Sequence, residues 1–320
     1  MRDHGGNLDM AIAAHGGQAE DWLDLSTGIN RRAYPMPVLP AGAVCALPRD
    51  SDIAALIDAA RLAYRSPAPI LPLAGAQAAI QLVPRLGPPG RARVLGPTYN
   101  EHAAALRAEG WQVDEVVTMA GLTGADLAIV VNPNNPDGRQ FAPKDLLALV
   151  PRVGRLVVDE SFADPVPQLS VAPWAERDGL IVLRSFGKFY GLAGLRLGFV
   201  LGPAADIARL AAMAGPWAVS GPAITAGTLA FRDADWAASM TETLAKDAAR
   251  LDALAARKGW QLRGGTHLFR LYETPDAPSA QAGLARHHVW SRIFLWSAQL
   301  VRLGLPGPEV EWTQLEAALG

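Results

Sequence analysis

The sequence predicts an α/β protein with a large domain built on a mostly parallel sheet. Two observations carry this prediction. Short apolar runs rich in Val, Ile and Leu, each bounded by Gly, Pro or Asp, recur along the first two thirds of the 320-residue chain. Alanine-rich segments with helical spacing lie between several of these runs. Continuous apolar runs are typical of strands buried on both faces, and strands that alternate with helices form parallel sheets.

The expected elements of the large domain follow in chain order. We expect helices at 101–111 and 143–153, where apolar residues recur at helical spacing. We expect strands at the six apolar runs, which are 67–74, 91–97, 126–133, 155–161, 179–186 and 195–202.

The pattern changes after about residue 215, where a smaller α+β region is expected. Its elements are one long helix at 233–260, short strands at 264–272, 287–294 and 298–306, and a closing helix at 311–320. We therefore predict a large domain over 41–215, and a small domain that joins 1–40 to 216–320.

Composition narrows the function classes. The formal net charge is −2, whereas a general nucleic-acid-binding protein would carry a basic face, so nucleic acid is not an expected partner. The one cysteine, Cys45, cannot form a disulfide within the chain. His and Cys residues do not cluster at metal-ligand spacing, so no metal is expected.

No feature of the sequence indicates a membrane protein. The opening residues, 1–10, are polar, unlike a signal peptide. The longest apolar stretch, 197–219, contains Asp206 and Arg209, so it is not an uninterrupted membrane span. We expect a soluble protein of a reducing compartment, namely the cytoplasm.

Polar residues follow the carboxyl ends of five predicted strands. In open parallel sheets, ligands bind outside these ends, so the residues should meet at one crevice. They are the glycine turn Gly75-Ala76-Gln77, then Tyr99, Asn135, Asp159, Ser185 and, just beyond, Lys188.

Lys188 is one of only four lysines among 29 basic residues. A chain that favours arginine so strongly would be expected to use arginine at an ordinary surface site. A lysine amine can form a Schiff base with an aldehyde cofactor, which an arginine cannot do. Lys188 is therefore the candidate for covalent attachment of such a cofactor.

Pyridoxal phosphate is an aldehyde cofactor that the other residues at the strand ends could bind. It needs an acid beside its ring nitrogen, a flat partner for its ring, and phosphate donors from a helix start, a hydroxyl and an arginine. Asp159 is the candidate acid, and Tyr99 is the candidate partner for the ring face. The candidate phosphate donors are Ala76, Gln77, Ser185 and Arg196, and Asn135 is a candidate donor to the ring oxygen next to the aldehyde.

Three motifs in order resemble the landmarks of fold-type-I pyridoxal-phosphate enzymes: NPNNPDG at 132–138, VVDES at 157–161 and SFGKFYGLAGLRLG at 185–198. The resemblance implies a class I/II aminotransferase-like fold, with a mostly parallel seven-stranded sheet and a smaller α+β domain. It implies pyridoxal 5′-phosphate held as an internal aldimine on Lys188, and catalysis by Lys188, Asp159 and Tyr99. The implied cofactor contacts are Gly75, Ala76, Gln77, Tyr99, Asn135, Asp159, Ser185, Lys188 and Arg196.

Four further segments resemble the threonine-phosphate decarboxylases of cobalamin biosynthesis: HGGN at 4–7, DLSTGIN at 24–30, PTYNEH at 97–102 and GGTHLFRL at 264–271. That family is close to the histidinol-phosphate aminotransferases. The resemblance implies decarboxylation of O-phospho-L-threonine to (R)-1-amino-2-propanol O-2-phosphate.

The resemblance also suggests the groups that bind the substrate. Arg302 resembles the carboxylate-binding arginine near the end of these enzymes, and an arginine fork matches a carboxylate with two hydrogen bonds. Arg292, Asn30 and His4 are candidates for the substrate's phosphate or carboxylate. Relatives are usually homodimers, and many place a tyrosine near Leu47 that reaches the neighbouring subunit's cofactor phosphate; this chain has leucine there.

Two alternatives to the decarboxylase stay open. One is an aminotransferase of the histidinol-phosphate type, although such enzymes usually have tyrosine where Phe162 stands. The other is a non-catalytic protein that keeps the fold, against which the intact set of Lys188, Asp159 and Arg196 argues. A nucleotide hydrolase is not expected, because the sequence has no G-x-x-x-x-G-K-S/T loop.

Overall fold

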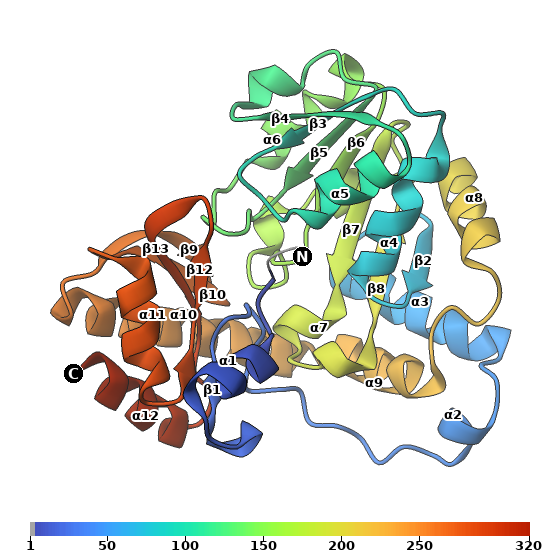
Figure 1. The fold of residues 1–320 in the computed structure, drawn as a ribbon. Helices are drawn as coiled ribbons and strands as arrows, with labels where there is room; N and C mark the ends of the chain where they lie inside the picture. The colour runs from blue at the N-terminus through green and yellow to red at the C-terminus, as the bar shows by residue number, and fades with distance from the viewer. Residues whose placement is uncertain (1–3) are drawn as a thin grey trace. The chain divides into compact units, whose positions relative to one another are not determined.

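The structure is a computed structural model that describes residues 4–320 (Figure 1). The described residues group into two compact units. Unit 1 comprises 4–33, 136–139 and 237–320, and unit 2 comprises 34–135 and 140–236.

Unit 2 is built on a sheet of seven strands among the described residues, in the order β2-β8-β7-β6-β5-β3-β4. Neighbouring strands are parallel except that β8 runs antiparallel to both β2 and β7. The predicted mostly parallel sheet is therefore confirmed. The strands are β2 (Ile70–Leu73), β3 (Arg91–Leu95), β4 (Gln112–Val116), β5 (Leu127–Val131), β6 (Leu156–Asp159), β7 (Leu180–Ser185) and β8 (Gly198–Leu201).

Each of the six predicted strand regions contains a strand, but β4 was not predicted. All residues of β5 and of β6 are buried, as expected for runs that are apolar throughout. In contrast, β4 lies at the edge of the sheet and is largely exposed, with Asp114 and Glu115 in its middle. An edge strand needs no continuous apolar run, so β4 could not be recognised from an apolar pattern.

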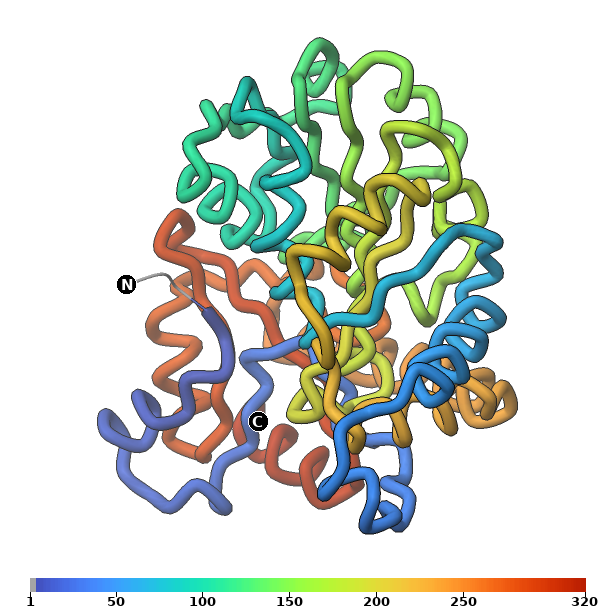
Figure 2. The backbone as a smooth tube through the Cα atoms, turned by 90° about the vertical axis from the view of Figure 1, so that its right-hand side faces the viewer, coloured from blue at the N-terminus to red at the C-terminus, as the bar shows by residue number. Residues whose placement is uncertain are grey.

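Helices cover both faces of this sheet. Figure 2 shows α4 and α5 on one side and α3 on the other. The helices of unit 2 are α2 (Gly42–Cys45), α3 (Asp50–Tyr64), α4 (Ala76–Leu82), α5 (Glu101–Ala108), α6 (Pro143–Leu147), α7 (Phe186–Phe189), α8 (Ala204–Ala214) and α9 (Gly221–Arg232).

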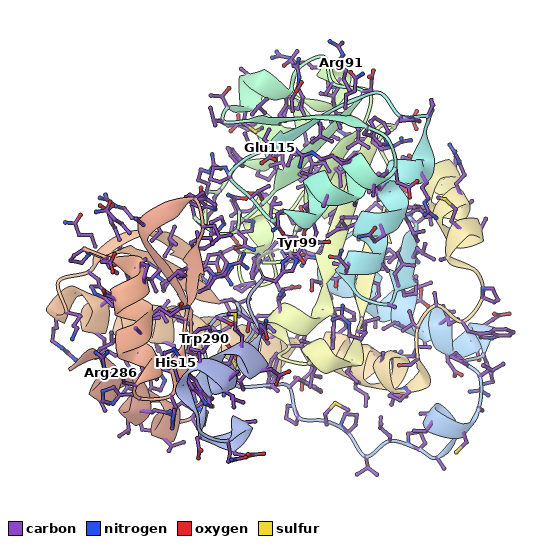
Figure 3. The ribbon with its side chains drawn as sticks, viewed as in Figure 1. His15, Arg91, Tyr99, Glu115, Arg286 and Trp290 are labelled. Carbon is purple, nitrogen blue, oxygen red and sulfur yellow. The ribbon has the colours of Figure 1, made fainter. Side chains whose placement is uncertain are left out.

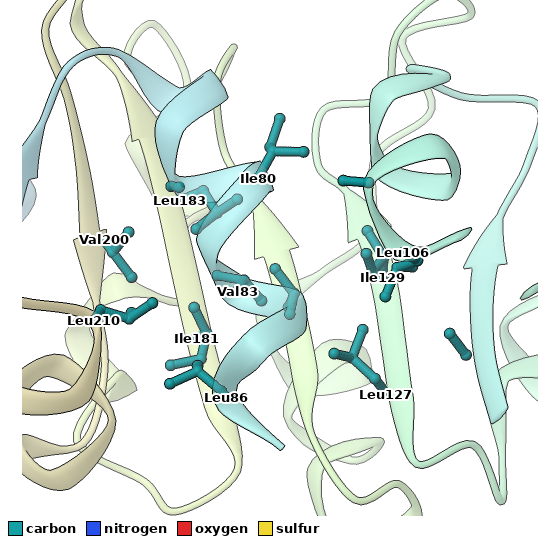
Figure 4. Packing of buried hydrophobic residues seen from close by; sticks show 14 of the residues in the cluster. Ile80, Val83, Leu86, Leu106, Leu127, Ile129, Ile181, Leu183, Val200 and Leu210 are labelled. Carbon is teal, nitrogen blue, oxygen red and sulfur yellow. The ribbon is translucent and has the colours of Figure 1, made fainter. Parts of the chain in front are cut away.

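Successive residues of β8 show how the two faces are filled. Val200 joins a core cluster with Ile80 of α4 and Leu210 of α8 (Figure 4). Its neighbour Phe199 points to the opposite face, as strand geometry requires, where its ring lies 5.8 Å from that of Tyr64 in α3. Full burial of each such side chain contributes about 1.5–3 kcal/mol, so the two apolar layers hold the sheet between the helices.

Unit 1 contains a four-stranded antiparallel sheet of order β12-β13-β10-β9 and a parallel pair, β1 with β11. The strands are β1 (Leu23–Asp24), β9 (Gln261–Thr266), β10 (Phe269–Glu273), β11 (Val289–Trp290), β12 (Arg292–Phe294) and β13 (Ser297–Gly304). The helices are α1 (Leu8–His15), most of α10 (Ala234–Arg257), α11 (Ala277–Ala285) and α12 (Glu309–Leu319).

Two predicted strands of this region are each divided in the structure. The run at 264–272 turns back on itself after Thr266, whose Oγ1 accepts a hydrogen bond from the Leu268 N–H at 3.0 Å. The run at 287–294 is interrupted at Ser291, so that β11 pairs with β1 while β12 joins the four-stranded sheet. Apolar content alone does not reveal where a strand changes partner.

Local signals set several helix ends. The Ser220 hydroxyl accepts a hydrogen bond from the Ala223 N–H at the start of α9, and the Asp276 carboxylate does the same for Ser279 in α11. The long α10 ends just before Gly259, whose φ of +80° suits glycine. Within residues 4–320, every helix is too short or too polar to span a bilayer.

Candidate active site

A pocket lies at the carboxyl ends of the unit-2 strands. Figure 3 shows that Arg91, where β3 begins, and Tyr99, which follows β3, lie at opposite ends of the sheet. The pocket is lined by all the residues proposed above for cofactor binding, by Ser161 and by several apolar neighbours: Gly75, Ala76, Gln77, Ile80, Tyr99, Val131, Asn135, Asp159, Ser161, Phe162, Ser185, Gly187, Lys188, Ala193, Arg196 and Leu197.

Asp159, the last residue of β6, is buried and held at both carboxylate oxygens. Oδ2 lies 2.8 Å from Nε2 of His102 in α5, and Nε2 must be the donor because an ionised carboxylate only accepts. Oδ1 accepts from the Ser161 hydroxyl at 2.5 Å and from the Ser161 N–H at 2.9 Å. Burial acts to raise the pKa of Asp159, but the hydrogen bonds from His102 and Ser161 lower it below its ordinary value.

His102 was not among the residues predicted to form the site. It lies in the first turn of α5, three residues after Tyr99, and 57 positions before its partner Asp159. Nothing local in the sequence connects the two residues. The pairing arises because α5 follows β3, and β3 lies two strands away from β6 in the sheet.

Lys188 lies in α7, one turn of helix directly after β7. Aromatic packing fixes this turn, because Tyr190 stacks on Phe186 at 4.5 Å and on Trp236 at 5.5 Å between ring centroids. The Lys188 Nζ lies 5.7 Å from the centroid of the Phe162 ring. This distance is within the range of a cation–π interaction.

Gly75 and Arg196 meet at the start of α4. Gly75 has φ +83° and ψ 162°, a conformation that only glycine adopts without strain. A Cβ on Gly75 would lie 2.7 Å from Nη2 of Arg196, and a Cβ on Gly198 would lie 2.3 Å from the Ala76 nitrogen. Both glycines therefore leave room for a guanidinium and for backbone N–H groups at the first turn of a helix, where those groups lack intrahelical partners.

We expect Gly75→Ala to lower the free energy of unfolding of the ligand-free protein. Gly215→Ala is a matched control, since Gly215 has φ +73° and ψ −178° but no described atom within 4 Å of its would-be Cβ. Backbone strain should cost about 1–3 kcal/mol in both variants, and Gly75→Ala should lose more because the methyl group also displaces Arg196. Urea unfolding compares them, and equal losses would mean that Arg196 moves aside without cost.

Asparagines fix the loop that follows β5 and carries Asn135 into the pocket. The buried Asn132 donates to the carbonyl oxygens of Phe141 and Leu169 and accepts from the Phe141 N–H. Asn134 donates to the Pro97 carbonyl at 3.0 Å. This loop is therefore tied to the segment after β3, which brings Tyr99 to the same pocket.

A second buried network lies directly beside the pocket residues. Arg184, which precedes Ser185, pairs with Glu160 at 2.8 Å and with Asp164 at 2.6 Å, and its guanidinium lies 4.3 Å from the Tyr64 ring centroid. Burial would lower the pKa of Arg184, but the two carboxylates raise it above its ordinary value. Burial also raises the pKa of Glu160, against the opposing effect of Arg184. The sequence analysis assigned no role to this network.

The four candidate substrate residues lie in unit 1, whereas the pocket residues lie in unit 2. Arg302 of β13 is buried, stands opposite Arg292 of β12, and donates from Nη2 to the Ser26 carbonyl at 2.5 Å. Asn30 is buried and accepts from the Arg32 N–H at 2.9 Å.

The exposed His4 begins a segment that packs on the same serine. The Gly6 N–H donates to the Ser26 Oγ at 2.7 Å. Unit 1 thus brings together the neighbourhood of His4 and Arg302, although they lie at opposite ends of the chain.

No group of three or more His, Cys, Asp or Glu side chains within residues 4–320 is placed to hold a metal ion.

Residues 50–294 match the family model described as aminotransferase class I and II. The chain belongs to this aminotransferase family. The family predicted from the three motifs is therefore confirmed.

Two individual proteins and one solved structure are also similar to this chain. A threonine-phosphate decarboxylase from Pseudomonas aeruginosa is 44% identical, and the match covers 100% of this chain and 97% of that protein. A histidinol-phosphate aminotransferase from Cronobacter sakazakii is 30% identical over 75% of this chain and 71% of its own. The fold matches the crystal structure of histidinol-phosphate aminotransferase from Sinorhizobium meliloti in complex with pyridoxal-5′-phosphate, with a TM-score of 0.82, 20% identity, and coverage of 97% and 92% of the two chains.

Proposed function

We propose that this protein is a pyridoxal 5′-phosphate-dependent decarboxylase. Its substrate would be O-phospho-L-threonine and its product (R)-1-amino-2-propanol O-2-phosphate, for cobalamin biosynthesis. The observation that carries the proposal is a single pocket. It combines Lys188, the hydrogen-bonded carboxylate of Asp159, and a cradle at the start of α4, which is the space between Gly75 and the guanidinium of Arg196. The 44% identity to a threonine-phosphate decarboxylase over the whole chain supports the choice of reaction.

The donor set fits the cofactor. Asp159 is a buried carboxylate whose pKa lies below its ordinary value, as a partner for a protonated ring nitrogen requires. The cradle that a Cβ on Gly75 would fill lies against the guanidinium of Arg196, which suits a phosphate group. Lys188 and Ser185 line the same pocket, so it also contains an amine for the aldehyde and a hydroxyl for the phosphate.

Each pocket residue has a place in this scheme. Lys188 would hold the aldehyde carbon and Asp159 the ring nitrogen, while Tyr99 would lie against the ring and Asn135 would donate to the ring oxygen. The phosphate would be held by Gly75, Ala76, Gln77, Ser185 and Arg196. When bound, the cofactor supplies an electron sink for the pair released at the substrate's Cα.

The chain's own residues then control protons and orientation. Asp159, which His102 and Ser161 hold in place, would keep a proton on the ring nitrogen. Lys188, whose Nζ lies 5.7 Å from the centroid of the Phe162 ring, would deliver a proton to Cα after CO₂ leaves.

The orientation of the substrate would decide which bond to Cα breaks, and the residues that bind its two anionic ends would set that orientation. We propose that Arg302, Arg292, Asn30 and His4 bind the substrate's two anionic ends. The buried guanidinium of Arg302 suits a carboxylate, with which it can form two parallel hydrogen bonds.

Phosphorus NMR of the protein with pyridoxal phosphate and O-phospho-L-threonine, without a keto acid, tests the function. We expect a new phosphate-ester signal and an equal amount of released CO₂. Omission of pyridoxal phosphate from the cofactor-stripped protein is the control. An unchanged spectrum with a bound cofactor would contradict the decarboxylase for this substrate.

The second candidate is an aminotransferase of the histidinol-phosphate type, which the 30% identity to such an enzyme favours. Only this activity consumes 2-oxoglutarate. The assay with histidinol phosphate and 2-oxoglutarate therefore separates the two reactions, and a protein that binds no cofactor would indicate a non-catalytic scaffold.

We also propose that the protein is a homodimer that acts in the cytoplasm. Apolar side chains are exposed along 36–47, namely Met36, Val38, Val44 and Leu47, and a second pocket lies between this segment and α9. The exposed thiol of Cys45 suits a reducing compartment.

Light scattering should give twice the 33.9 kDa chain mass, and a Val44→Glu/Leu47→Glu variant should shift it towards one chain mass. Val310→Glu, on the similarly exposed Val310, is the control. A single-chain mass for the unmodified protein would contradict the dimer.

A further inference from the structure

The hydroxyl of Ser161 donates a hydrogen bond to the carboxylate of Asp159. Ser161 is buried and lines the pocket, and its Oγ lies 2.5 Å from Oδ1 of Asp159. Its backbone N–H donates to the same oxygen at 2.9 Å. One residue therefore supplies two donors to a single carboxylate oxygen.

The hydrogen bonds of Asp159 can be counted oxygen by oxygen. An ionised carboxylate has about two lone-pair sites on each oxygen. Both sites on Oδ1 are taken by Ser161, and one site on Oδ2 is taken by His102. The remaining acceptor site is therefore on Oδ2.

We propose that Ser161 is a positioning residue that saturates Oδ1 of Asp159, so that only Oδ2 can accept a hydrogen bond from the cofactor's ring nitrogen. This inference rests on the proposed function, since it concerns how the cofactor is held. The hydroxyl also fixes the plane of the carboxylate, because donors hold one oxygen from the end of β6 and the other from α5.

Without the hydroxyl, one site on Oδ1 opens and the carboxylate loses a charge-assisted hydrogen bond. The ring nitrogen could then donate to either Oδ1 or Oδ2 of Asp159, and the plane of this carboxylate would be less firmly fixed. We expect weaker retention of the ring-nitrogen proton and weaker binding of the cofactor.

The neighbouring acid offers a matched control. The Ser170 hydroxyl donates to Oε2 of Glu160 at 2.5 Å, and both residues are buried. Ser170 does not line the pocket. Ser170→Ala thus removes the same kind of bond from the adjacent carboxylate, and a purely structural role for either serine would give similar effects in both variants.

The test uses protein reconstituted with pyridoxal phosphate labelled with ¹⁵N in the ring. The ¹⁵N chemical shift reports ring protonation, and fluorescence titration gives the dissociation constant. For Ser161→Ala we expect a shift towards the unprotonated ring and a dissociation constant raised about tenfold, as for the loss of one hydrogen bond to a charged group. Ser161→Thr, which keeps the hydroxyl, should resemble the unmodified protein, and so should Ser170→Ala.

Ser161→Cys keeps the branching of the side chain, at a slightly larger volume, with a weaker donor. It should shift the signal in the same direction, which keeps the test valid if Ser161→Ala does not fold. Ring signals and dissociation constants within twofold of the unmodified protein for the folded Ala and Cys variants would overturn the inference while leaving the proposed function intact. An unmodified protein that binds no pyridoxal phosphate would overturn both.

Discussion

Lys188→Ala is expected to abolish decarboxylation, with kcat lowered by about 10³-fold or more, since a single residue both anchors the cofactor and moves the proton. The fold should survive. The side chain projects into the pocket, and α7 is held by Phe186 and Tyr190 through aromatic stacking rather than by the lysine. CO₂ release and the absorbance of bound pyridoxal phosphate check the two effects.

Lys144→Ala removes an exposed lysine from α6 and should keep full activity and absorbance. Lys188→Arg keeps the charge but cannot attach to an aldehyde, so it should be as inactive as Lys188→Ala. If Lys188→Ala kept more than about a tenth of the activity, the assignment of proton transfer to this lysine would be wrong.

Arg184→Met is expected to lower the free energy of unfolding by about 3–5 kcal/mol, because it leaves two carboxylates buried without their cation. Glu160 and Asp164 both lie within 2.8 Å of Arg184, and the three side chains are little exposed, at 0%, 9% and 4% respectively. Urea unfolding of the ligand-free protein measures the loss.

The chain offers an exposed counterpart for comparison. Arg250 also bridges two acids, Glu309 and Glu316, and lies 4.4 Å from the centroid of the Trp312 ring, against 4.3 Å for Arg184 and Tyr64. Its side chain is 35% exposed, compared with 4% for Arg184. Arg250→Met should therefore cost only a small part of what Arg184→Met costs, since water screens exposed pairs. Equal losses would show that burial does not set the strength of the Arg184 network.

The parts of the fold that the sequence predicted share one property. Strands such as β5 and β6 are buried on both faces, so their apolar runs are continuous and their positions are readable. The edge strand β4 has no such constraint. The division of 287–294 between two sheets was not predicted either, because strand partners depend on residues far away in the chain.

The same distinction applies to the candidate site. Residues at strand ends, such as Asp159 and Lys188, could be proposed because the carboxyl ends of parallel strands converge. His102 and Arg184 could not, since their roles depend on partners 57 and 24 positions away. Ser161 lies only two positions from Asp159, but a serine hydroxyl has many possible acceptors, and its choice is visible only in three dimensions.

The discontinuity of unit 1 has a consequence for biosynthesis. Its segment 4–33 is made before unit 2, yet β1 pairs with β11, so that Leu23 lies beside Val289. A ribosome adds about 5–20 residues per second. Val289 is therefore synthesised about 15–50 s after Leu23. During that interval the strands of unit 2 emerge in succession and can pair. Unit 2, which carries the pocket, can therefore begin to assemble while segment 4–33 of unit 1 is still without its strand partner.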